Sequence, residues 1–250
     1  SIEASFLSIF ALISFFIFLI ISKFSHKLRN GALLDEDFLK PQAFHEIPVT
    51  RSGGIAVIIS FSIFLVIYYL LYKKILYDYI FISYSVFLVG FLDDLRINLN
   101  PLKRLIIMML LLFIFINFLP IKILNIDIPL LTSLMSNYTF SSIFVLLCFL
   151  FVINGANLID GFNGLLTINL IIINIILTYI NINNENLEFS MLIISQIIIL
   201  FSFLLFNFPN AKIFFGDSGA YTTGALTGLN IIITNNLNPL ISSFFFCTLL

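Results

Sequence analysis

Eight apolar runs of nearly membrane-spanning length limit how this chain can fold. A helix needs about 20 residues to cross the hydrocarbon core of a bilayer, and roughly 17–25 is the usual range. We predict membrane spans at residues 4–21, 55–72, 75–92, 105–119, 141–153, 165–180, 189–206 and 220–234, with a ninth that begins near Ile241. Several runs are short, so we expect their polar flanks to extend the helices into the headgroup layer.

Charged residues are scarce along the whole chain. They make up 10% of the sequence, and the mean hydropathy is +1.13, whereas soluble domains carry about 25% charged residues. The predicted fold class is therefore an all-α polytopic integral membrane protein, with residues 1–250 forming a single transmembrane domain. A net charge of −1 argues against a general nucleic-acid binder.

The distribution of basic residues predicts the orientation. One side of the membrane receives the segments 22–54, 93–104, 154–164 and 207–219. The other side receives the segments 73–74, 120–140, 181–188 and 235–240. Nine lysines and arginines fall on the first side and three on the second. Cytoplasmic loops carry the excess of these residues, so we expect the first side to be cytoplasmic and the N-terminus to lie outside.

Two stretches lack a clear functional signal. The outer segment 121–131 (IKILNIDIPLL) is partly alternating, and it fits either a small hairpin or a segment that lies on the membrane surface. The Asn- and Ile-rich stretch 171–186 is interpreted as compositional bias without chemistry.

Paired aspartates follow the third span. Adjacent helical residues point about 100° apart, so Asp93 and Asp94 are expected to face different partners. An isolated pair of this kind is commonly a solvated helix end. Carboxylates at a helix C-terminus oppose the helix dipole, however, and a metal ion would offset that effect. Both aspartates are therefore candidate catalytic residues.

A polar island, NGANLIDGFNG at residues 154–164, separates the fifth and sixth spans. It places Asp160 among Asn154, Asn157 and Asn163. Amides and a carboxylate at a helix start can hydrogen-bond a sugar or a uridine, or they can serve only as helix caps. Because three asparagines exceed what one cap requires, we favour a role in binding or catalysis.

Two further motifs contain candidate site residues. In FFGDSG, Asp217 beside the Ser218 hydroxyl offers the hard oxygen ligands that Mg²⁺ prefers, although this motif alone is typical of a plain turn. In HEIPVTRSGG, His45 and Arg51 precede Gly53–Gly54 at the start of a span. An arginine beside a helix N-terminus can bind an anion, and an ordinary positive-inside anchor is the alternative.

Together, these motifs resemble the polyprenyl-phosphate N-acetylhexosamine-1-phosphate transferases. That family includes the initiating enzymes of O-antigen, enterobacterial common antigen and teichoic acid synthesis, and phospho-N-acetylmuramoyl-pentapeptide translocase. The resemblance rests on four stretches that occur in the family's order between about residues 45 and 228, which are HEIPVTRSGGIAV, GFLDDLRINLNPLKRL, NGANLIDGFNGL and FNFPNAKIFFGDSG.

The resemblance implies a reaction and a set of site residues. A polyprenyl phosphate would attack the β-phosphate of a UDP-sugar and release UMP, with Mg²⁺, or Mn²⁺ in its place, as cofactor. Asp217 would be the metal ligand and Asp93 the base that deprotonates the lipid phosphate, with Asp94 supporting either the metal or the base. Asp160 would belong to the nucleotide-sugar site. The expected substrate-binding residues are His45, Arg51, Lys103, Asn154, Asn157 and Asn163.

The same resemblance implies partners and a location. We expect a UDP-sugar, a polyprenyl phosphate lipid and the bilayer as partners, with a homodimer as one option for assembly. The expected location is the bacterial inner membrane, with the site on its cytoplasmic face. The form IPVTRSGG is more similar to the O-antigen and common-antigen branch, which favours UDP-GlcNAc or a 6-deoxy relative as donor.

Two alternatives remain, and the chain departs from the family at one point. The peptidoglycan translocase is the alternative within the family, and a membrane transporter is the alternative from another class. Members of the family carry a later loop with an HxH-type motif, whereas the histidines here are His26 and His45. The chain also stops inside an apolar run, so we expect a fragment that lacks this loop.

Overall fold

The computed structural model describes residues 2–25, 27, 33–35, 49–95, 100–119, 121–124 and 126–249. Within these residues the chain forms ten helices and one short antiparallel pair of strands. The helices are α1 (Ile2–Phe24), α2 (Gly53–Tyr72), α3 (Tyr77–Asp94), α4 (Pro101–Phe118), α5 (Pro129–Met135), α6 (Tyr138–Ile159), α7 (Leu165–Asn183), α8 (Leu187–Asn207), α9 (Gly216–Leu237) and α10 (Ser243–Thr248), and the strands are β1 (Leu34–Asp35) and β2 (Val49–Thr50).

The fold is that of an all-α polytopic membrane protein, as predicted. Eight long helices lie where the apolar runs predict spans, and α10 begins close to the expected start of a ninth. Six of the eight, which are α1, α2, α4, α6, α7 and α8, are long and apolar enough to cross a membrane by length and composition. The number of crossings and their orientation stay predictions.

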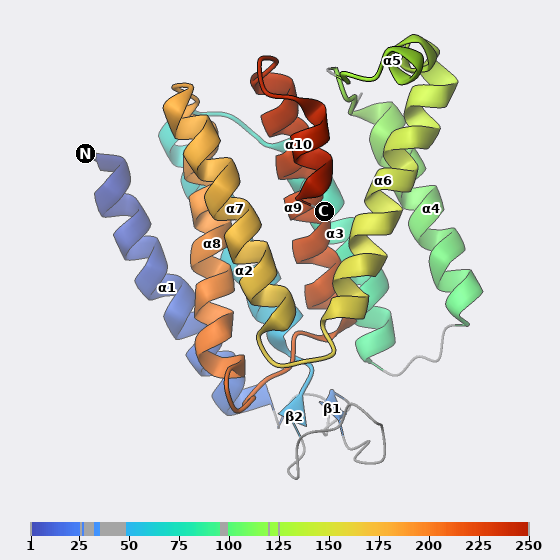
Figure 1. The fold of residues 1–250 in the computed structure, drawn as a ribbon. Coiled ribbons are helices and arrows are strands. Elements are labelled where there is room, and N and C mark those ends of the chain that lie inside the picture. The colour runs from blue at the N-terminus through green and yellow to red at the C-terminus, as the bar shows by residue number, and fades with distance from the viewer. Residues whose placement is uncertain are drawn as a thin grey trace.

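Successive long helices run in opposite directions through the bundle (Figure 1). The C-terminal ends of α1, α3, α6 and α8 therefore lie at the same end as the N-terminal ends of α2, α4, α7 and α9. This is the end that carries the polar motifs, so the grouping predicted from the basic residues matches the arrangement in space.

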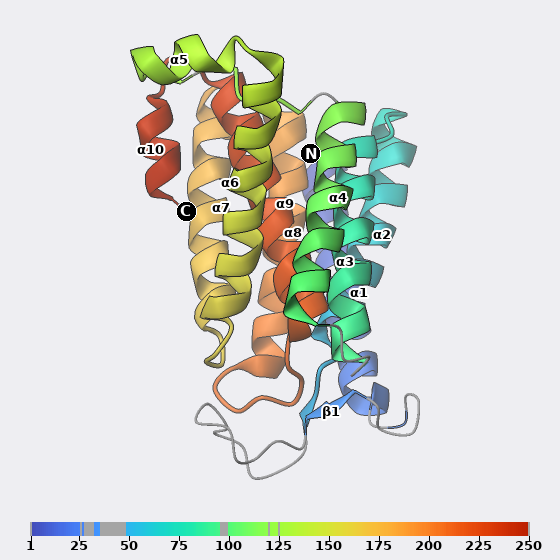
Figure 2. The same cartoon turned by 90° about the vertical axis from the view of Figure 1, so that its right-hand side faces the viewer.

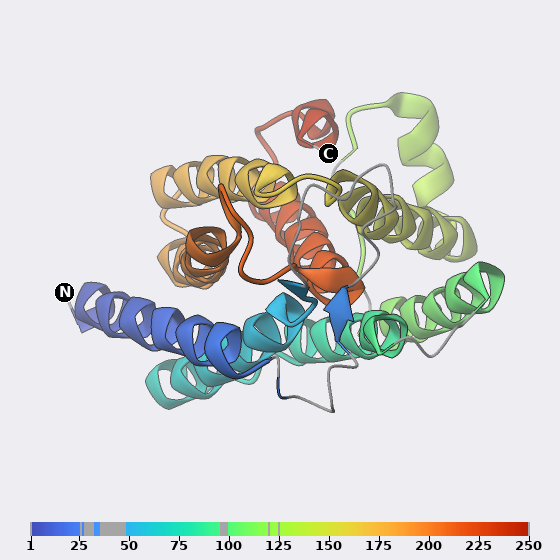
Figure 3. The same ribbon diagram turned by 90° about the horizontal axis from the view of Figure 1, so that it is seen from below.

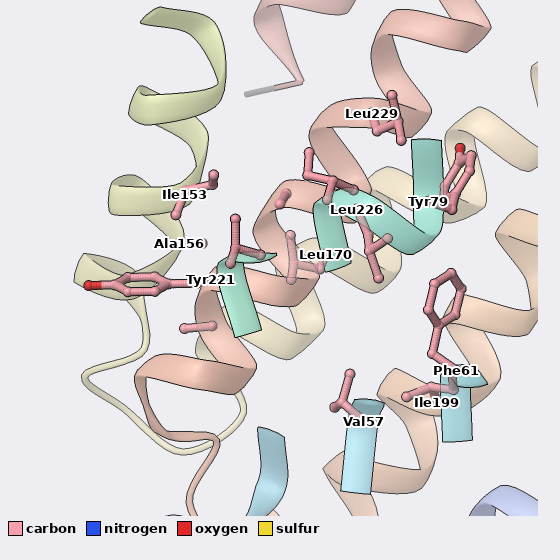
Figure 4. Close-up of a cluster of buried hydrophobic side chains, with 14 of the residues drawn as sticks. Val57, Phe61, Tyr79, Ile153, Ala156, Leu170, Ile199, Tyr221, Leu226 and Leu229 are labelled. Atoms are coloured by element: carbon pink, nitrogen blue, oxygen red, sulfur yellow. The ribbon is translucent and has the colours of Figure 1, made fainter. Parts of the chain in front are cut away.

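Helix α9 is the innermost helix of the bundle (Figure 3). It packs against α2, α3, α6 and α7, and nearly all of its residues from Ser218 to Asn235 are buried. Small residues at a helix interface let the neighbouring backbones approach closely. A Cβ at Gly224, for example, would lie 2.7 Å from the Cβ of Ala156 on α6. Large apolar side chains of the surrounding helices complete the core around Leu226 and Leu229 (Figure 4).

Two asparagines on α7 have a structural role that the interpretation of residues 171–186 as compositional bias did not foresee. Asn174 and Asn181 are fully buried. Their Nδ2 atoms donate to Thr227 Oγ1 (3.0 Å) and Thr234 Oγ1 (2.9 Å) on α9. The spacing of seven residues on both helices keeps the two contacts on one face. An amide inside an apolar helix finds its partner on the neighbouring helix, so these two positions join α7 to α9.

A buried polar network joins four helices through Asn230 of α9. Asn230 Oδ1 accepts from the Tyr79 hydroxyl of α3 (2.7 Å). Its Nδ2 donates to Asn174 Oδ1 of α7 (2.8 Å) and to Gln196 Oε1 of α8 (2.7 Å). The network therefore fixes α9 relative to α3, α7 and α8.

We expect Asn230→Leu to lower the free energy of unfolding by about 2–4 kcal/mol, because the hydroxyl and amides around it would lose their partner in a buried setting. Thermal unfolding in detergent measures the effect. Asn169→Leu is the matched control, since Asn169 is exposed and, among the described residues, its side chain donates to the Leu165 carbonyl of its own helix (2.8 Å). Equal stabilities of the two variants would contradict the structural role of the network.

The outer connection between α4 and α6 lies across the end of the bundle (Figure 2). Residues 121–124 and 126–128 have no strand structure, and α5 follows. The Asn236 side chain of α9 holds this segment through Leu124 N (2.8 Å) and the Lys122 carbonyl (2.7 Å). Of the two predicted forms, the hairpin is therefore wrong for the described residues of this segment.

Candidate active site

Glycines bring three helices together at the start of α9. A Cβ at Gly54 of α2 would lie 2.1 Å from Ser218 Oγ, and a Cβ at Gly90 of α3 would lie 2.5 Å from Ser218 N. Neither position has room for a side chain, so both glycines allow a close approach of their helices to the N-terminus of α9. This contact places the end of α3, with its two aspartates, beside Asp217.

Asp94 caps α9 from the neighbouring helix. Its side chain is 1% exposed. The carboxylate accepts from Asp217 N (2.8 Å), from Ser218 N (3.0 Å) and from Ser218 Oγ (2.5 Å). The first N–H groups of a helix lack partners within the helix and carry its positive dipole end. For Asp94, the favourable charge that we expected from a metal ion thus comes from α9. The Ser218 hydroxyl is engaged in the same contact.

Asp93 and Asp217 share one cation, Arg104. Its Nη1 atom lies 2.6 Å from Asp93 Oδ2 and 2.8 Å from Asp217 Oδ2. All three side chains are about a quarter exposed or less. The guanidinium also lies over the Tyr221 ring, 5.7 Å from its centroid. Asp93 of α3 and Asp217 of α9 therefore meet at a single point that is partly exposed to solvent.

The prediction of Lys103 and Arg51 as phosphate-binding cations overlooked Arg104, the neighbour of Lys103. The structure leaves Lys103 exposed. Helix α4 buries Met108 and Leu112, and Arg104 lies on the same face at a spacing of four residues. That spacing was the available signal, but the run that follows is apolar on every face, so the buried side could not be recognised from the sequence.

The polar island contains more helix than predicted. Helix α6 continues through Ile159, so Asn154 and Asn157 lie near a helix end and not in a loop before a helix. Asn154 Nδ2 donates to the Leu150 carbonyl of its own helix (2.7 Å). Helix α7 begins after Gly164 without a side-chain cap. The capping alternative is thus wrong for the island. The Asn154 amide instead donates one hydrogen bond to a carbonyl of its own helix.

The end of the island is held by the segment that precedes α9. Asn163 Nδ2 donates to the Pro209 carbonyl (3.0 Å). Asn207, which sequence reasoning missed, accepts from Gly164 N (2.7 Å) and donates to the Ile213 carbonyl (3.0 Å). One side chain at the end of α8 therefore positions both the turn after α6 and the segment leading to Asp217.

Asp160 lies within electrostatic range of the other aspartates. Burial raises the pKa of its carboxyl well above the ordinary value, and the charges of Asp217 and Asp94 act in the same direction. The positive charge of Arg51 lowers this pKa, and it also acts on Asp94. The structure thus gathers residues from the starts of α2, α4 and α9 and the ends of α3 and α6.

The segment before α2 is fixed by backbone contacts. Phe214 N donates to the Thr50 carbonyl (2.8 Å), while Gly53 N and Gly54 N donate to the Phe214 and Phe215 carbonyls (2.9 Å each). The amides of Gly53 and Gly54 are therefore engaged by backbone carbonyls, and Arg51 is the residue of this motif that carries a positive charge. His45 lies outside the described residues.

The donor set suits a hard divalent cation. Within the described ranges, no group of three His, Cys, Asp or Glu residues is arranged to hold a metal. Mg²⁺ commonly binds through one or two carboxylates, with water and substrate phosphates completing its coordination. Asp93 and Asp217 converge on one position and supply two such carboxylates. Their number and chemistry fit what a Mg²⁺ ion would require from the protein.

Comparison with known families agrees with this geometry. Residues 76–235 match the model of glycosyl transferase family 4. The match spans more than half of the chain, and the chain belongs to this family. A search of curated proteins finds no match. The matched region includes Asp93, Asp94, Arg104, Asp160 and Asp217. The protein is thus a membrane-embedded transferase of the kind that transfers sugar phosphates.

Proposed function

We propose that this protein transfers a sugar 1-phosphate from a UDP-sugar to polyprenyl phosphate and releases UMP. The convergence of Asp93, Asp217 and Arg104 at one end of an apolar helix bundle carries the proposal. A substrate with a soluble charged head and a second substrate with a membrane-embedded tail can meet only near a membrane surface. The position of these three side chains suits both.

The chemistry follows from the charges that must meet. An oxygen of the lipid phosphate forms a bond to the β-phosphorus, and the bond from that phosphorus to the UMP oxygen breaks. Asp93 accepts the proton of the lipid phosphate at Oδ1, since its Oδ2 is the oxygen at the point shared with Asp217. Mg²⁺, with Mn²⁺ as a substitute, would be held by Asp217 and Asp93, and it supplies charge neutralisation for the phosphates when bound. Asp94 positions Asp217 by capping α9.

The remaining predicted residues would form the substrate site. Asp160, whose carboxyl is within electrostatic range of Asp217 and Asp94, is assigned to the nucleotide sugar together with the asparagine amides of the polar island. The cations are assigned to the phosphates because each approaching group is anionic. The proposed substrate-binding residues are His45, Arg51, Lys103, Asn154, Asn157 and Asn163. The proposed donor is UDP-GlcNAc or a 6-deoxy relative, as in the O-antigen branch, and the proposed face is cytoplasmic.

A transporter is the less favoured alternative. Transporters hold ionisable residues near the bilayer midplane, often on broken helices. In the described part of this chain, the polar network within the bundle consists of uncharged groups such as Asn174, Gln196 and Asn230. The aspartates instead lie at the ends of helices. This division favours chemistry at one membrane surface.

We expect UMP release from UDP-GlcNAc by membranes that contain the protein, and we expect it to require both undecaprenyl phosphate and Mg²⁺. Membranes without the protein are the control. Release with another UDP-sugar and not with UDP-GlcNAc would keep the reaction and change the donor. If a properly inserted protein releases no UMP from any UDP-sugar, the proposal is wrong.

A further inference from the structure

A single nitrogen atom occupies the point where the two carboxylates meet. Arg104 Nη1 contacts the Oδ2 atoms of both Asp93 and Asp217, at 2.6 and 2.8 Å. Carboxylate oxygens of this kind are also the protein ligands that a Mg²⁺ ion would take. The guanidinium and the ion therefore require the same space and the same ligand atoms.

Arg104 uses only part of its hydrogen-bonding capacity in this contact. A guanidinium has five N–H donors in a planar fork. Within the described part of the chain, its hydrogen bonds are the two made by Nη1. The side chain is 23% exposed. The other donors are thus available to a planar anion such as a phosphate, which arginine binds through two parallel bonds.

Tyr221 gives the guanidinium a second point of attachment. It lies one turn after Asp217 on α9, its ring is fully buried, and Arg104 lies over the ring face. Figure 4 shows Tyr221 projecting from α9 among the core side chains. The attraction between the ring and a cation does not depend on the carboxylates. Arg104 can therefore leave the aspartate pair and remain at the site.

We propose that Arg104 competes with the divalent cation for the Asp93–Asp217 pair and moves onto the diphosphate of the UDP-sugar when the cation binds. This inference rests on the proposed function. Two positive groups on the same oxygens repel each other, so the ion displaces the guanidinium. The incoming diphosphate offers the acceptors that the fork prefers. Arg104 thereby couples metal binding to donor binding.

Manganese binding measured by electron paramagnetic resonance, without nucleotide or lipid, tests the competition. We expect Arg104→Met to bind Mn²⁺ about tenfold more tightly than the wild type, because the two carboxylates lose a competing cation. Lys122→Met is the matched control. Lys122 also lies over a tyrosine ring, Tyr138 at 5.5 Å, but it belongs to the segment between α4 and α5 at the opposite end of the bundle from the aspartates. Its removal should leave Mn²⁺ affinity unchanged.

The second half of the proposal predicts the opposite sign for the donor. With Mn²⁺ saturating, Arg104→Met should bind UDP-GlcNAc about tenfold more weakly, because the diphosphate loses its charge-assisted bonds. Should Arg104→Met fail to fold, Arg104→Gln takes its place with the same expectations, since glutamine still offers an N–H to a carboxylate.

Equal or weaker Mn²⁺ binding by the Arg104 variant would overturn the proposal and make Arg104 a simple brace between two carboxylates. The result is independent of turnover. A protein that binds Mn²⁺ as expected but releases no UMP would contradict the proposed reaction and leave the competition for the metal standing. Unchanged donor affinity would overturn the transfer of Arg104 to the diphosphate.

Discussion

Asp217→Asn is expected to reduce UMP release by about 10³-fold while the protein still inserts and folds. The substitution keeps the size of the side chain and removes the charge that a metal ion and Arg104 both require. Loss of one preorganised electrostatic group at a reacting phosphate commonly has an effect of this order. The rate of UMP release at saturating UDP-sugar and lipid measures it.

Asp127→Asn is the matched control for this substitution. Asp127 is an aspartate beside the start of a helix, as Asp217 is, and it accepts from Ser243 N (2.7 Å), but it lies in the segment between α4 and α5 at the opposite end of the bundle. Its activity should equal that of the wild type. If the activity of Asp217→Asn stays within about tenfold of the wild type, Asp217 does not supply the electrostatic stabilisation proposed for it.

Gly216→Ala is expected to destabilise the protein by roughly 3–5 kcal/mol and to lower activity by at least about 10²-fold. Gly216 has a φ of +72°, which alone makes a side chain unfavourable by about 1–3 kcal/mol. A Cβ would lie 2.6 Å from Asp94 Oδ2. The clash would displace Asp94 from the α9 amides, and each charge-assisted bond is worth about 1.5–3 kcal/mol. A shift of about 1 Å at Asp217 accounts for the loss of activity.

Gly155→Ala provides the comparison for stability. Gly155 is helical, and a Cβ there would meet nothing within 4 Å. Alanine in a helix is more favourable than glycine by up to about 1 kcal/mol. Thermal unfolding in detergent should therefore separate the two variants with opposite signs. If Gly216→Ala is as stable as Gly155→Ala, the contact between Asp94 and the start of α9 does not stabilise the protein as described.

The helices could be predicted because their signal is local. Apolar runs of the required length specify helices in a bilayer, where each backbone group must find a partner within the chain. Helix ends were less certain, because polar residues extend α6 past Ile153 to Ile159. The role of Asn174 and Asn181 was missed for another reason. Whether an asparagine faces lipid or another helix depends on packing, which the sequence of α7 alone does not show.

The acidic residues of the candidate site were recognised because carboxylates are rare in so apolar a chain. The expectation that Asp93 and Asp94 face different partners is confirmed, but the sequence could not show which partner each one has. Asp93 pairs with Arg104, and Asp94 accepts from the amides of α9. That division follows from the crossing of α3 and α9 at Gly90, a contact between residues far apart in the sequence.

The fate of the β-phosphate in the UMP-release assay is the most direct test of the proposed transferase reaction. A UDP-sugar labelled at that phosphate should deliver the label, together with the sugar, to the lipid fraction, and unlabelled UMP should remain in water. Asp217→Asn membranes should leave the label in water. Label that remains on a released UDP, with only the sugar in the lipid, would contradict transfer of a sugar 1-phosphate.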